Sequence, residues 1–356
     1  MERVYNFAAG PSTLALPVLE RAQKEMLCYG STGMSVMEMT HRSKMYTDIY
    51  DAAVAELKTL MAIPDNYEVI FMQGGATLQF SGVPLNMMVK GVADYVDSGN
   101  FAHLAAEEAK RYGQVNVIAS SREDNYTYIP EVKNFTEGAD YVYITTNNTI
   151  YGTRYTAIPK CASPLVADMS SNILSEVYNM NDFGVVFAGA QKNIGPSGLC
   201  IMIIRKDLLG NAMPACPKLM DWKVEVEKGS MYNTPNTWGI YMAKLTFDWL
   251  IENGGVAEME KRNIEKAKLL YDCIDNSKLF KNTVKPEFRS RMNVTFVTGD
   301  KDKDEAFVKA ATAAGLMNIK GHRAVGGMRA SIYNAMPIEG VKALVDFMQK
   351  YEAQAK

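Results

Sequence analysis

The feature that most constrains the fold is an alternation of short apolar runs with amphipathic helical patterns. Between the earlier runs lie helical patterns at 78–88 and 103–112. Such an alternation predicts a largely parallel sheet with helices on both faces, an α/β fold class whose ligands bind at the carboxyl ends of the strands. The runs expected to be strands are 68–73, 92–96, 115–119, 141–145, 165–167, 185–188 and 199–204.

The C-terminal part of the chain repeats this alternation on a smaller scale. A long charged helical pattern at 256–274 is expected to be the bridge to it. A chain of 356 residues suits two packed lobes rather than one small domain. The second lobe is expected to contain strands at 292–297 and 328–333 and helices at 305–314 and 338–351.

Composition argues against several functional classes. A net charge of −2 gives no sequence-wide reason to bind nucleic acid or an acidic membrane. The five cysteines and three histidines show no zinc-ligand spacing. The N-terminus lacks a basic segment followed by a long apolar one, and no uncharged run approaches the length of a membrane span. We therefore expect a cytoplasmic protein with no metal, nucleic-acid or membrane partner.

One lysine follows directly on an apolar run. Lys192 comes after the small residues Ala188, Gly189 and Ala190, which would leave room for a bulky group, while Asp168 ends a neighbouring run. Taken singly, Lys192 is better explained as an exposed turn lysine, and Asp168 is a good helix N-cap. A parallel sheet would nevertheless bring both to one edge, where a buried carboxylate needs a cation or N–H donors.

Two other patterns suit anionic ligands. The segment 74–77, Gly-Gly-Ala-Thr, follows a strand and opens a helix, so its N–H groups could cradle a phosphate. It is neither a Walker A sequence nor G-x-G-x-x-G, and a plain tight turn explains it equally well.

Histidine and arginine occur as neighbours twice. The pairs at 41–42 and 322–323 lie in loops, and Arg329 lies on an expected strand. Each arginine alone could be a surface residue, but together they suggest a pocket for a doubly anionic small molecule, because arginine grips carboxylate and phosphate with two bonds.

These motifs, taken together, resemble the pyridoxal-phosphate-dependent phosphoserine aminotransferases of the class V aminotransferase family. The resemblance runs nearly from end to end. It implies PLP-dependent transferase fold type I, with a large cofactor-binding domain at 16–258 and a small α/β domain formed by 1–15 and 259–356. The motifs are Asn6-Phe-x-x-Gly-Pro, Ser35-Val-Met-Glu-x-x-His-Arg, Gly74-Gly, Ala167-Asp-x-Ser-Ser, Phe187-Ala-Gly-Ala-Gln-Lys-Asn-Ile-Gly-Pro and Gly321-His-Arg-x-Val-Gly-Gly-Met-Arg-Ala-Ser-Ile-Tyr-Asn-Ala.

The resemblance also implies how pyridoxal 5'-phosphate is held. Lys192 matches the lysine that forms the Schiff base, and Asp168 matches the carboxylate paired with the pyridinium nitrogen. The other cofactor-binding residues that it implies are Ala76 and Thr77 as backbone donors to the phosphate, Phe101 against the ring, Thr149 and Gln191 as polar contacts, and Asn233 and Thr234 from the other subunit of a homodimer with shared active sites.

For the substrates, the resemblance implies a basic pocket and an anchor. His41, Arg42, His322 and Arg323 match the site for a phosphate or side-chain carboxylate, some of them across the dimer, and Arg329 matches the α-carboxylate anchor. The implied reaction is a ping-pong transamination between glutamate and 3-phosphohydroxypyruvate that gives O-phospho-L-serine in serine biosynthesis. Action on the 4-phosphohydroxy-L-threonine of pyridoxine biosynthesis is implied as a further option.

Two positions depart from the family pattern. Thr77 stands where many members have arginine, and Phe101 where many have a stacked tryptophan, so we expect a somewhat weaker hold on the cofactor.

Two other kinds of enzyme, and one kind of regulatory protein, are alternatives to the function that the resemblance implies. A class V transaminase with an unphosphorylated acceptor would not need both His-Arg pairs. A nicotinamide-dependent dehydrogenase should show G-x-G-x-x-G, which the turn at 74–77 lacks. A cofactor-binding regulator would need a nucleic-acid-binding module beyond the two lobes.

Overall fold

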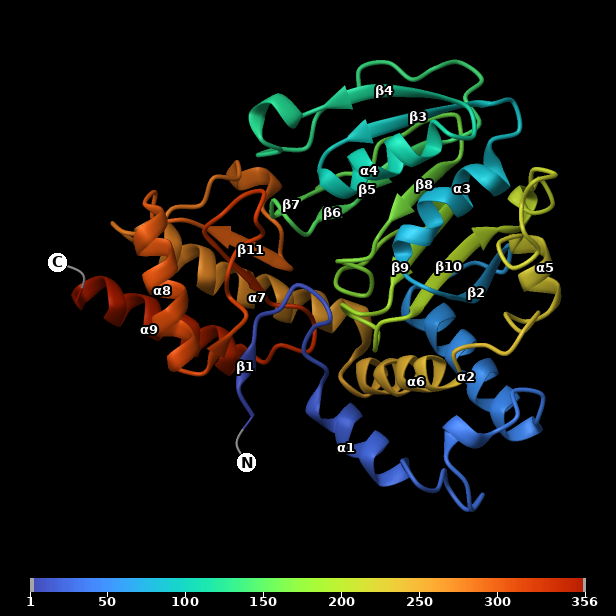
Figure 1. The fold of residues 1–356 in the computed structure, drawn as a ribbon, viewed down its shortest axis with the longest axis horizontal. Helices are drawn as coiled ribbons and strands as arrows, with labels where there is room; N and C mark the ends of the chain where they lie inside the picture. The colour runs from blue at the N-terminus through green and yellow to red at the C-terminus, as the bar shows by residue number, and fades with distance from the viewer. Residues whose placement is uncertain (1–2, 355–356) are drawn as a thin grey trace.

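The structure is a computed structural model that describes residues 3–354, and a mixed sheet forms its centre (Figure 1). The strands of this sheet are β2 (Tyr67–Gln73), β3 (Val92–Asp97), β4 (Gln114–Ser120), β5 (Val142–Thr145), β8 (Leu165–Asp168), β9 (Val185–Gly189) and β10 (Leu199–Arg205). Their order is β2-β10-β9-β8-β5-β3-β4. β10 runs antiparallel to β2 and β9, while the other pairings are parallel. The predicted, mostly parallel α/β sheet is confirmed.

The inner strands β5, β8 and β9 are buried on both faces because they are apolar at successive positions, whereas the edge strand β4 is partly exposed. In β10, Ile201 packs into one hydrophobic core and its neighbour Met202 into the other. Among residues 3–354, no helix combines the length and the apolar character needed to cross a membrane. The helices α3 (Gln79–Met87), α4 (Asn100–Ala109) and α5 (Trp222–Glu227) cover one face, and α1 (Leu16–Glu25), α2 (Lys44–Leu60) and α6 (Thr237–Glu252) cover the other (Figure 1).

A second, smaller core lies beside the sheet, where Figure 1 shows the orange and red part of the chain. The helix α7 (Gly255–Asn276) spans both cores, since Met259 packs into the large one and Leu270 into the small one. The N-terminal strand β1 pairs with β12, and Phe7 packs into the small core. The elements of this lobe are β1 (Tyr5–Asn6), α7 (Gly255–Asn276), β11 (Asn293–Phe296), α8 (Lys301–Ala313), β12 (Leu316–Met317), β13 (Met328–Ser331) and α9 (Ile338–Gln354). The domain boundaries at residues 15/16 and 258/259 stay a prediction.

Several elements differ from the sequence expectation. α8 begins at Lys301 rather than at residue 305, because the Asp300 carboxylate caps it by accepting the N–H groups of Asp302 and Lys303. α4 begins at Asn100, directly after a glycine, rather than at residue 103. A short hairpin of β6 (Asn147–Asn148) and β7 (Thr153–Arg154) was not anticipated.

Candidate active site

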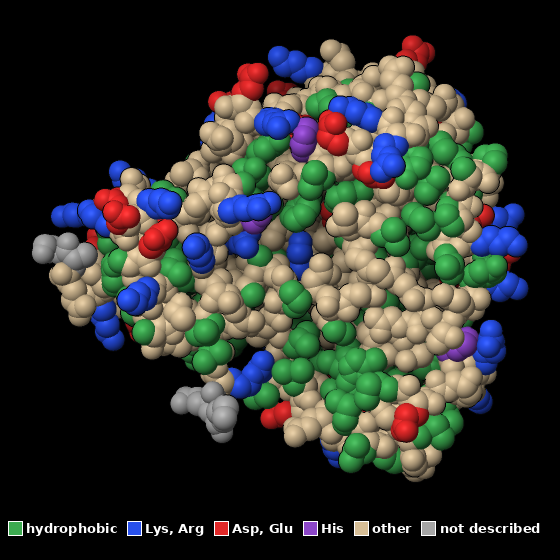
Figure 2. Space-filling model, viewed as in Figure 1, with side chains coloured by type: hydrophobic (Ala, Val, Ile, Leu, Met, Phe, Trp, Pro, Cys, Tyr) green, Lys and Arg blue, Asp and Glu red, His purple; other side chains and the backbone are tan. Residues whose placement is uncertain are grey.

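A cavity of about 270 Å³ lies at the carboxyl ends of the parallel strands, where both lobes contribute to its wall. In the space-filling view, Lys, Arg and His side chains border the hollow between the smaller lobe and the sheet (Figure 2). The predicted site residues that line this cavity are Ala76, Thr77, Phe101, Thr149, Asp168, Gln191, Lys192, His322 and Arg329.

Lys192 and Asp168 lie close together because the adjacent strands β8 and β9 are parallel. Asp168 is the last residue of β8, is only 5% exposed, and accepts the N–H of Ser170 at 2.8 Å. Lys192 follows β9, and its Nζ donates to Thr149 Oγ1 at 2.9 Å. The ammonium also lies 5.6 Å from the centre of the Phe101 ring. An amine, a carboxylate and an aromatic ring therefore share one cavity.

Burial shifts the pKa of both groups toward their neutral forms. It lowers the pKa of Lys192 to about 8, with the Arg329 charge acting in the same direction and the Asp168 charge against it. It raises the pKa of Asp168, against the hydrogen bonds from Ser170 and the Lys192 charge. Near neutral pH, Lys192 thus has a neutral fraction that can act as a nucleophile or base, which suits a catalytic amine.

The turn after β2 lines the cavity and opens a helical segment. Gly74 has φ +89°, a conformation that favours glycine, and the chain then enters the short 3-10 helix η2 (Ala76–Leu78) and α3. The N–H groups of Ala76 and Thr77 meet no acceptor within the described chain. A helix start with unpaired N–H groups suits an anion.

Three buried polar atoms of the cavity wall also have no hydrogen-bond partner among residues 3–354. They are Thr145 Oγ1, Gln191 Oε1 and Arg329 Nε. Because unpaired buried polar atoms are costly, their presence in one cavity favours a polar ligand that satisfies them.

The N-terminal segment covers the lysine. The N–H of Ser12 donates to Gln191 O at 3.0 Å, and its hydroxyl donates to Lys192 O at 2.5 Å. A Cβ at Gly10 would lie 3.4 Å from Lys192 Cγ, where φ is +142°. The sequence left open whether residues 1–15 cover a core or the active site, and Ala9 and Gly10 line the cavity.

The expectation that Ala188 and Ala190 leave room for a ligand was wrong. Both are fully buried in the large core and do not line the cavity. Gly189 makes room in a different way, since a Cβ there would lie 2.8 Å from Gln191 Oε1 and 3.4 Å from Ala76 Cβ. The glycine therefore accommodates the Gln191 side chain.

Five predicted residues do not line the cavity of this chain: His41, Arg42, Asn233, Thr234 and Arg323. His41 is buried, and its Nε2 has no partner in the part of the chain that the structure describes. Burial, and then the charge of Arg42, lowers the pKa of His41.

The loop at 233–234 nevertheless lies next to the turn at 74–77, since it is bonded to the residue that precedes this turn. Gln73, the last residue of β2, donates through Nε2 to Asn233 Oδ1 at 2.7 Å and to Thr234 O at 2.9 Å. Sequence reasoning missed other lining residues, among them Asn147, Ser170 and the Thr145 hydroxyl. Ser170 could have been predicted from the sequence, because it lies two positions after Asp168 in the motif Ala167-Asp-x-Ser-Ser.

Comparison with known proteins places the chain in a family. The model of the aminotransferase class-V family matches residues 4–344. The chain belongs to the class V aminotransferases. This aminotransferase is 53% identical to the phosphoserine aminotransferase of Listeria innocua over 353 residues, 99% of this chain and 97% of that one. It is 52% identical to the phosphoserine aminotransferase of Bacillus cereus over 358 residues, 99% of each chain.

Solved structures agree with this assignment. The aminotransferase superposes on phosphoserine aminotransferase from Bacillus circulans subsp. alkalophilus with a TM-score of 0.98 and 43% identity, covering 100% of each chain. The PLP-bound phosphoserine aminotransferase of Trichomonas vaginalis gives a TM-score of 0.92 and 40% identity, with 98% of this chain and 100% of that one covered. The predicted family, fold and cofactor, pyridoxal 5'-phosphate, are confirmed.

Proposed function

We propose that this aminotransferase exchanges an amino group between glutamate and 3-phosphohydroxypyruvate, giving 2-oxoglutarate and O-phospho-L-serine in serine biosynthesis. The observation that carries the proposal is the meeting, in one cavity, of Lys192 and Asp168 with the guanidinium of Arg329 and the imidazole of His322. Relatives more than 50% identical over 99% of the chain, which are phosphoserine aminotransferases, support the substrate assignment.

The cavity has the groups that pyridoxal 5'-phosphate requires. When bound, this cofactor supplies a carbonyl carbon that carries the amino group and an electron-withdrawing ring. The unpaired N–H groups of the turn suit its phosphate, the buried Asp168 carboxylate its ring nitrogen, and the Phe101 ring its flat face. We assign its binding to Ala76, Thr77, Phe101, Thr149, Asp168, Gln191 and Lys192, and to Asn233 and Thr234 of a second subunit.

Lys192 moves the proton in this proposal. Its Nζ, with a pKa of about 8, takes up the proton from Cα of the amino-acid substrate and would pass it to the carbon that the bound cofactor supplies. Thr149 Oγ1 holds Nζ at 2.9 Å and so orients it. The N-terminal segment, which bonds to the Lys192 carbonyl, screens this position from water.

Arg329 anchors the α-carboxylate that both amino-acid substrates share. Its Nη1 donates to Thr149 O at 3.2 Å, while its buried Nε has no partner within residues 3–354 and is available to a carboxylate. His322 lines the same cavity. With Arg323, and with His41 and Arg42 of a second subunit, it is proposed to receive either the phosphate or the glutamate side-chain carboxylate.

A homodimer with shared active sites is part of the proposal. The residues at 41–42 and 233–234 do not reach the cavity of their own chain, which supports their action across a dimer. A cytoplasmic location and the division into domains 16–258 and 1–15 with 259–356 complete the proposal.

Substrate preference tests the proposal. The purified holoenzyme is assayed with 2-oxoglutarate as acceptor and phosphoserine, serine or alanine as amino donor. We expect phosphoserine to be preferred by roughly 100-fold or more, because a desolvated cationic pocket left without its anion is costly. Equal kcat/KM for serine or alanine would favour the transaminase with an unphosphorylated acceptor. A parallel assay with 4-phosphohydroxy-L-threonine decides whether pyridoxine biosynthesis is served.

A further inference from the structure

The two lobes touch at backbone level beside the cavity, where β11 packs against the turn between β6 and β7. A Cβ at Gly152 in that turn would lie 2.8 Å from Asn293 O and 3.0 Å from Thr295 Oγ1. Gly152 has φ +78°, so both conformation and space favour glycine. Its carbonyl accepts the N–H of Ser290 at 2.8 Å. The position of the small lobe is therefore set closely at this contact.

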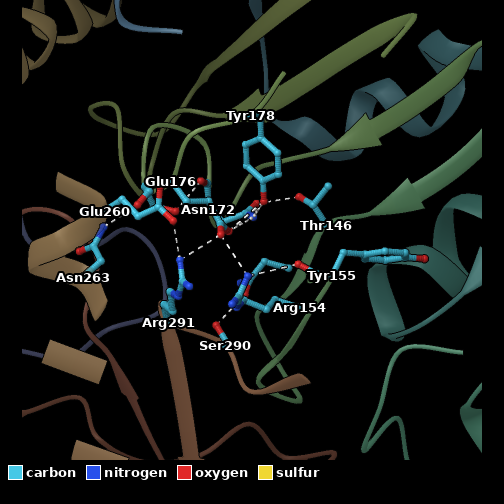
Figure 3. Close-up of polar contacts among 12 residues, drawn as sticks. Thr146, Arg154, Tyr155, Asn172, Glu176, Tyr178, Glu260, Asn263, Ser290 and Arg291 are labelled. Carbon is cyan, nitrogen blue, oxygen red and sulfur yellow. Dashed lines mark hydrogen bonds and ion pairs between the residues drawn. The ribbon is translucent and has the colours of Figure 1, made fainter. Parts of the chain in front are cut away.

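An ionic cluster flanks the contact (Figure 3). Glu176 accepts from Arg154 at 3.0 Å and from Arg291 at 3.4 Å, and Arg291 also pairs with Glu260 at 2.8 Å. Two arginines and two glutamates balance in charge, and they join the large lobe, the small lobe and α7. None of the four lines the cavity, so they hold the lobes together without aiming at the substrate.

Asn293 lies at the centre of a second, uncharged network at the same contact. Its side chain is fully buried on β11. Its Oδ1 accepts from Asn147 Nδ2 at 2.8 Å, and its Nδ2 donates to Ser331 Oγ at 3.0 Å and to Tyr333 OH at 3.1 Å. Both amide protons are thus used in a place that water does not reach.

Each hydrogen-bond partner of Asn293 either lines the cavity or is connected to a residue that does. Asn147 lines it. Ser331 lies two residues after Arg329 on β13, and side chains two apart share one face of a strand. The Tyr333 hydroxyl donates to the carbonyl of Ala9, which also lines the cavity.

Arg329 has little of its own to fix its direction. The one hydrogen bond that its side chain makes to the described chain runs from Nη1 to Thr149 O, and its Nε is unpaired. The guanidinium is therefore placed mainly by the backbone of β13.

We propose that Asn293 is a positioning residue for the α-carboxylate anchor: its amide fixes β13 against the turn at 147–153, and thereby aims Arg329 into the cavity. The inference rests on the proposed role of Arg329. Asn293 does not line the cavity, so replacing it should change ligand binding only through Arg329. Binding of a ligand's carboxylate should therefore weaken, whereas binding of its phosphate should not.

Two non-reacting probes separate these sites in the holoenzyme. 3-Phosphoglycerate carries a carboxylate and a phosphate, whereas glycerol 1-phosphate lacks the carboxylate. Asn293→Leu removes all three side-chain bonds at similar volume. Calorimetric titration should show binding of 3-phosphoglycerate weakened about tenfold, as for one misdirected charge-assisted hydrogen bond, and glycerol 1-phosphate changed less than about twofold.

The chain offers a matched control in Asn86. This residue is 4% exposed, and its side chain also makes three hydrogen bonds: Nδ2 to Gly82 O and to Met220 O at 2.8 Å each, and Oδ1 from Trp222 N at 3.0 Å. It lies outside the cavity wall. Asn86→Leu should lower the thermal midpoint comparably and leave both probes unchanged.

A double-mutant cycle separates failure of the inference from failure of the proposed function. Arg329→Ala should weaken the binding of 3-phosphoglycerate but not that of glycerol 1-phosphate. In the Arg329→Ala variant, the additional change Asn293→Leu should cause no further loss of 3-phosphoglycerate binding. The role of Asn293 would be overturned if the two substitutions caused additive losses of 3-phosphoglycerate affinity. It would also be overturned if Asn293→Leu weakened the binding of both probes equally. If Arg329→Ala leaves 3-phosphoglycerate unaffected, the anchor itself is wrong. Should Asn293→Leu not fold, Ser331→Ala removes one bond of the network and is read by the same criteria, with a loss of about threefold expected.

Discussion

The two halves of the site differ in how the protein builds them. Most of the proposed cofactor half lies at one edge of the sheet, where Asp168, Lys192 and the turn at 74–77 of one chain line the same cavity. The proposed substrate half draws on the small lobe and on a second subunit. Arg329 reaches the cavity from β13, while His41 and Arg42 do not reach it from their own chain.

This difference means that the groups proposed for the reaction and those proposed for substrate binding are held by different parts of the fold. A group held by strands is fixed by the sheet's backbone hydrogen bonds, so its geometry changes little when a substrate binds. A group held by a second lobe depends on inter-lobe contacts such as those of Asn293. Mutations in the first half should therefore abolish turnover, whereas those in the second should change substrate affinity.

The largest effect is expected for Lys192→Ala. Removing the amine takes away the proposed acceptor of the Cα proton, so kcat should fall by roughly 10³-fold or more. Rapid mixing of the variant with glutamate measures this in a single turnover. Thermal unfolding should show that the fold persists. A variant with kcat within tenfold of the parent enzyme would contradict the assignment of Lys192.

Arg329→Ala should come next. Losing one partner of a buried, hydrogen-bonded charge pair costs on the order of 2–5 kcal/mol, so kcat/KM should fall roughly 100-fold, mainly through KM. The loss should be similar for glutamate and phosphoserine because both carry the α-carboxylate. Arg329→Lys, which keeps the charge but not the two-pronged geometry, should recover part of it. A loss confined to phosphoserine would show that Arg329 serves the phosphate.

The cofactor half could largely be predicted from the sequence, because it follows from local patterns. Apolar runs identify strands, and parallel strands bring the residues after them to one edge, which places Asp168 beside Lys192. The resemblance to a family supplied the roles. The reach of Arg329 into the cavity needed that resemblance, since spacing alone left it a possible surface residue.

The inter-lobe network could not be predicted in this way. Asn293 and Asn147 are separated by 146 positions, and both belong to short strands, one of them in a hairpin without a strong apolar pattern. Nothing local indicates that two asparagines will pair across lobes. The N-cap of α8 shows a smaller failure of the same kind, since a charged first turn conceals the start of the helix.

The pH dependence of cofactor capture sharpens the description of the cofactor half. In the cofactor-free enzyme only the neutral amine of Lys192 can attack a carbonyl. Because burial lowers its pKa to about 8, capture should accelerate about tenfold per pH unit up to that point and level off above it. Stopped-flow absorbance from about pH 6 to about pH 11 measures the midpoint. A midpoint near the ordinary lysine pKa of about 10.4 would mean that the amine is well solvated.

The smallest expected effect concerns the aromatic ring beside the lysine. The centre of the Phe101 ring lies 5.6 Å from Lys192 Nζ, and the residue lines the cavity, so the ring can cover the cofactor ring, but with less area than an indole. Phe101→Trp should tighten cofactor binding by about 0.5–1.5 kcal/mol, or roughly 2–10-fold, and Phe101→Leu should weaken it by a similar factor. Equilibrium dialysis gives both dissociation constants, while the KM for phosphoserine should stay constant. If the tryptophan variant instead changes that KM and leaves cofactor affinity unaltered, residue 101 contacts the substrate rather than the cofactor. The start of α4 would then belong to the substrate half of the site.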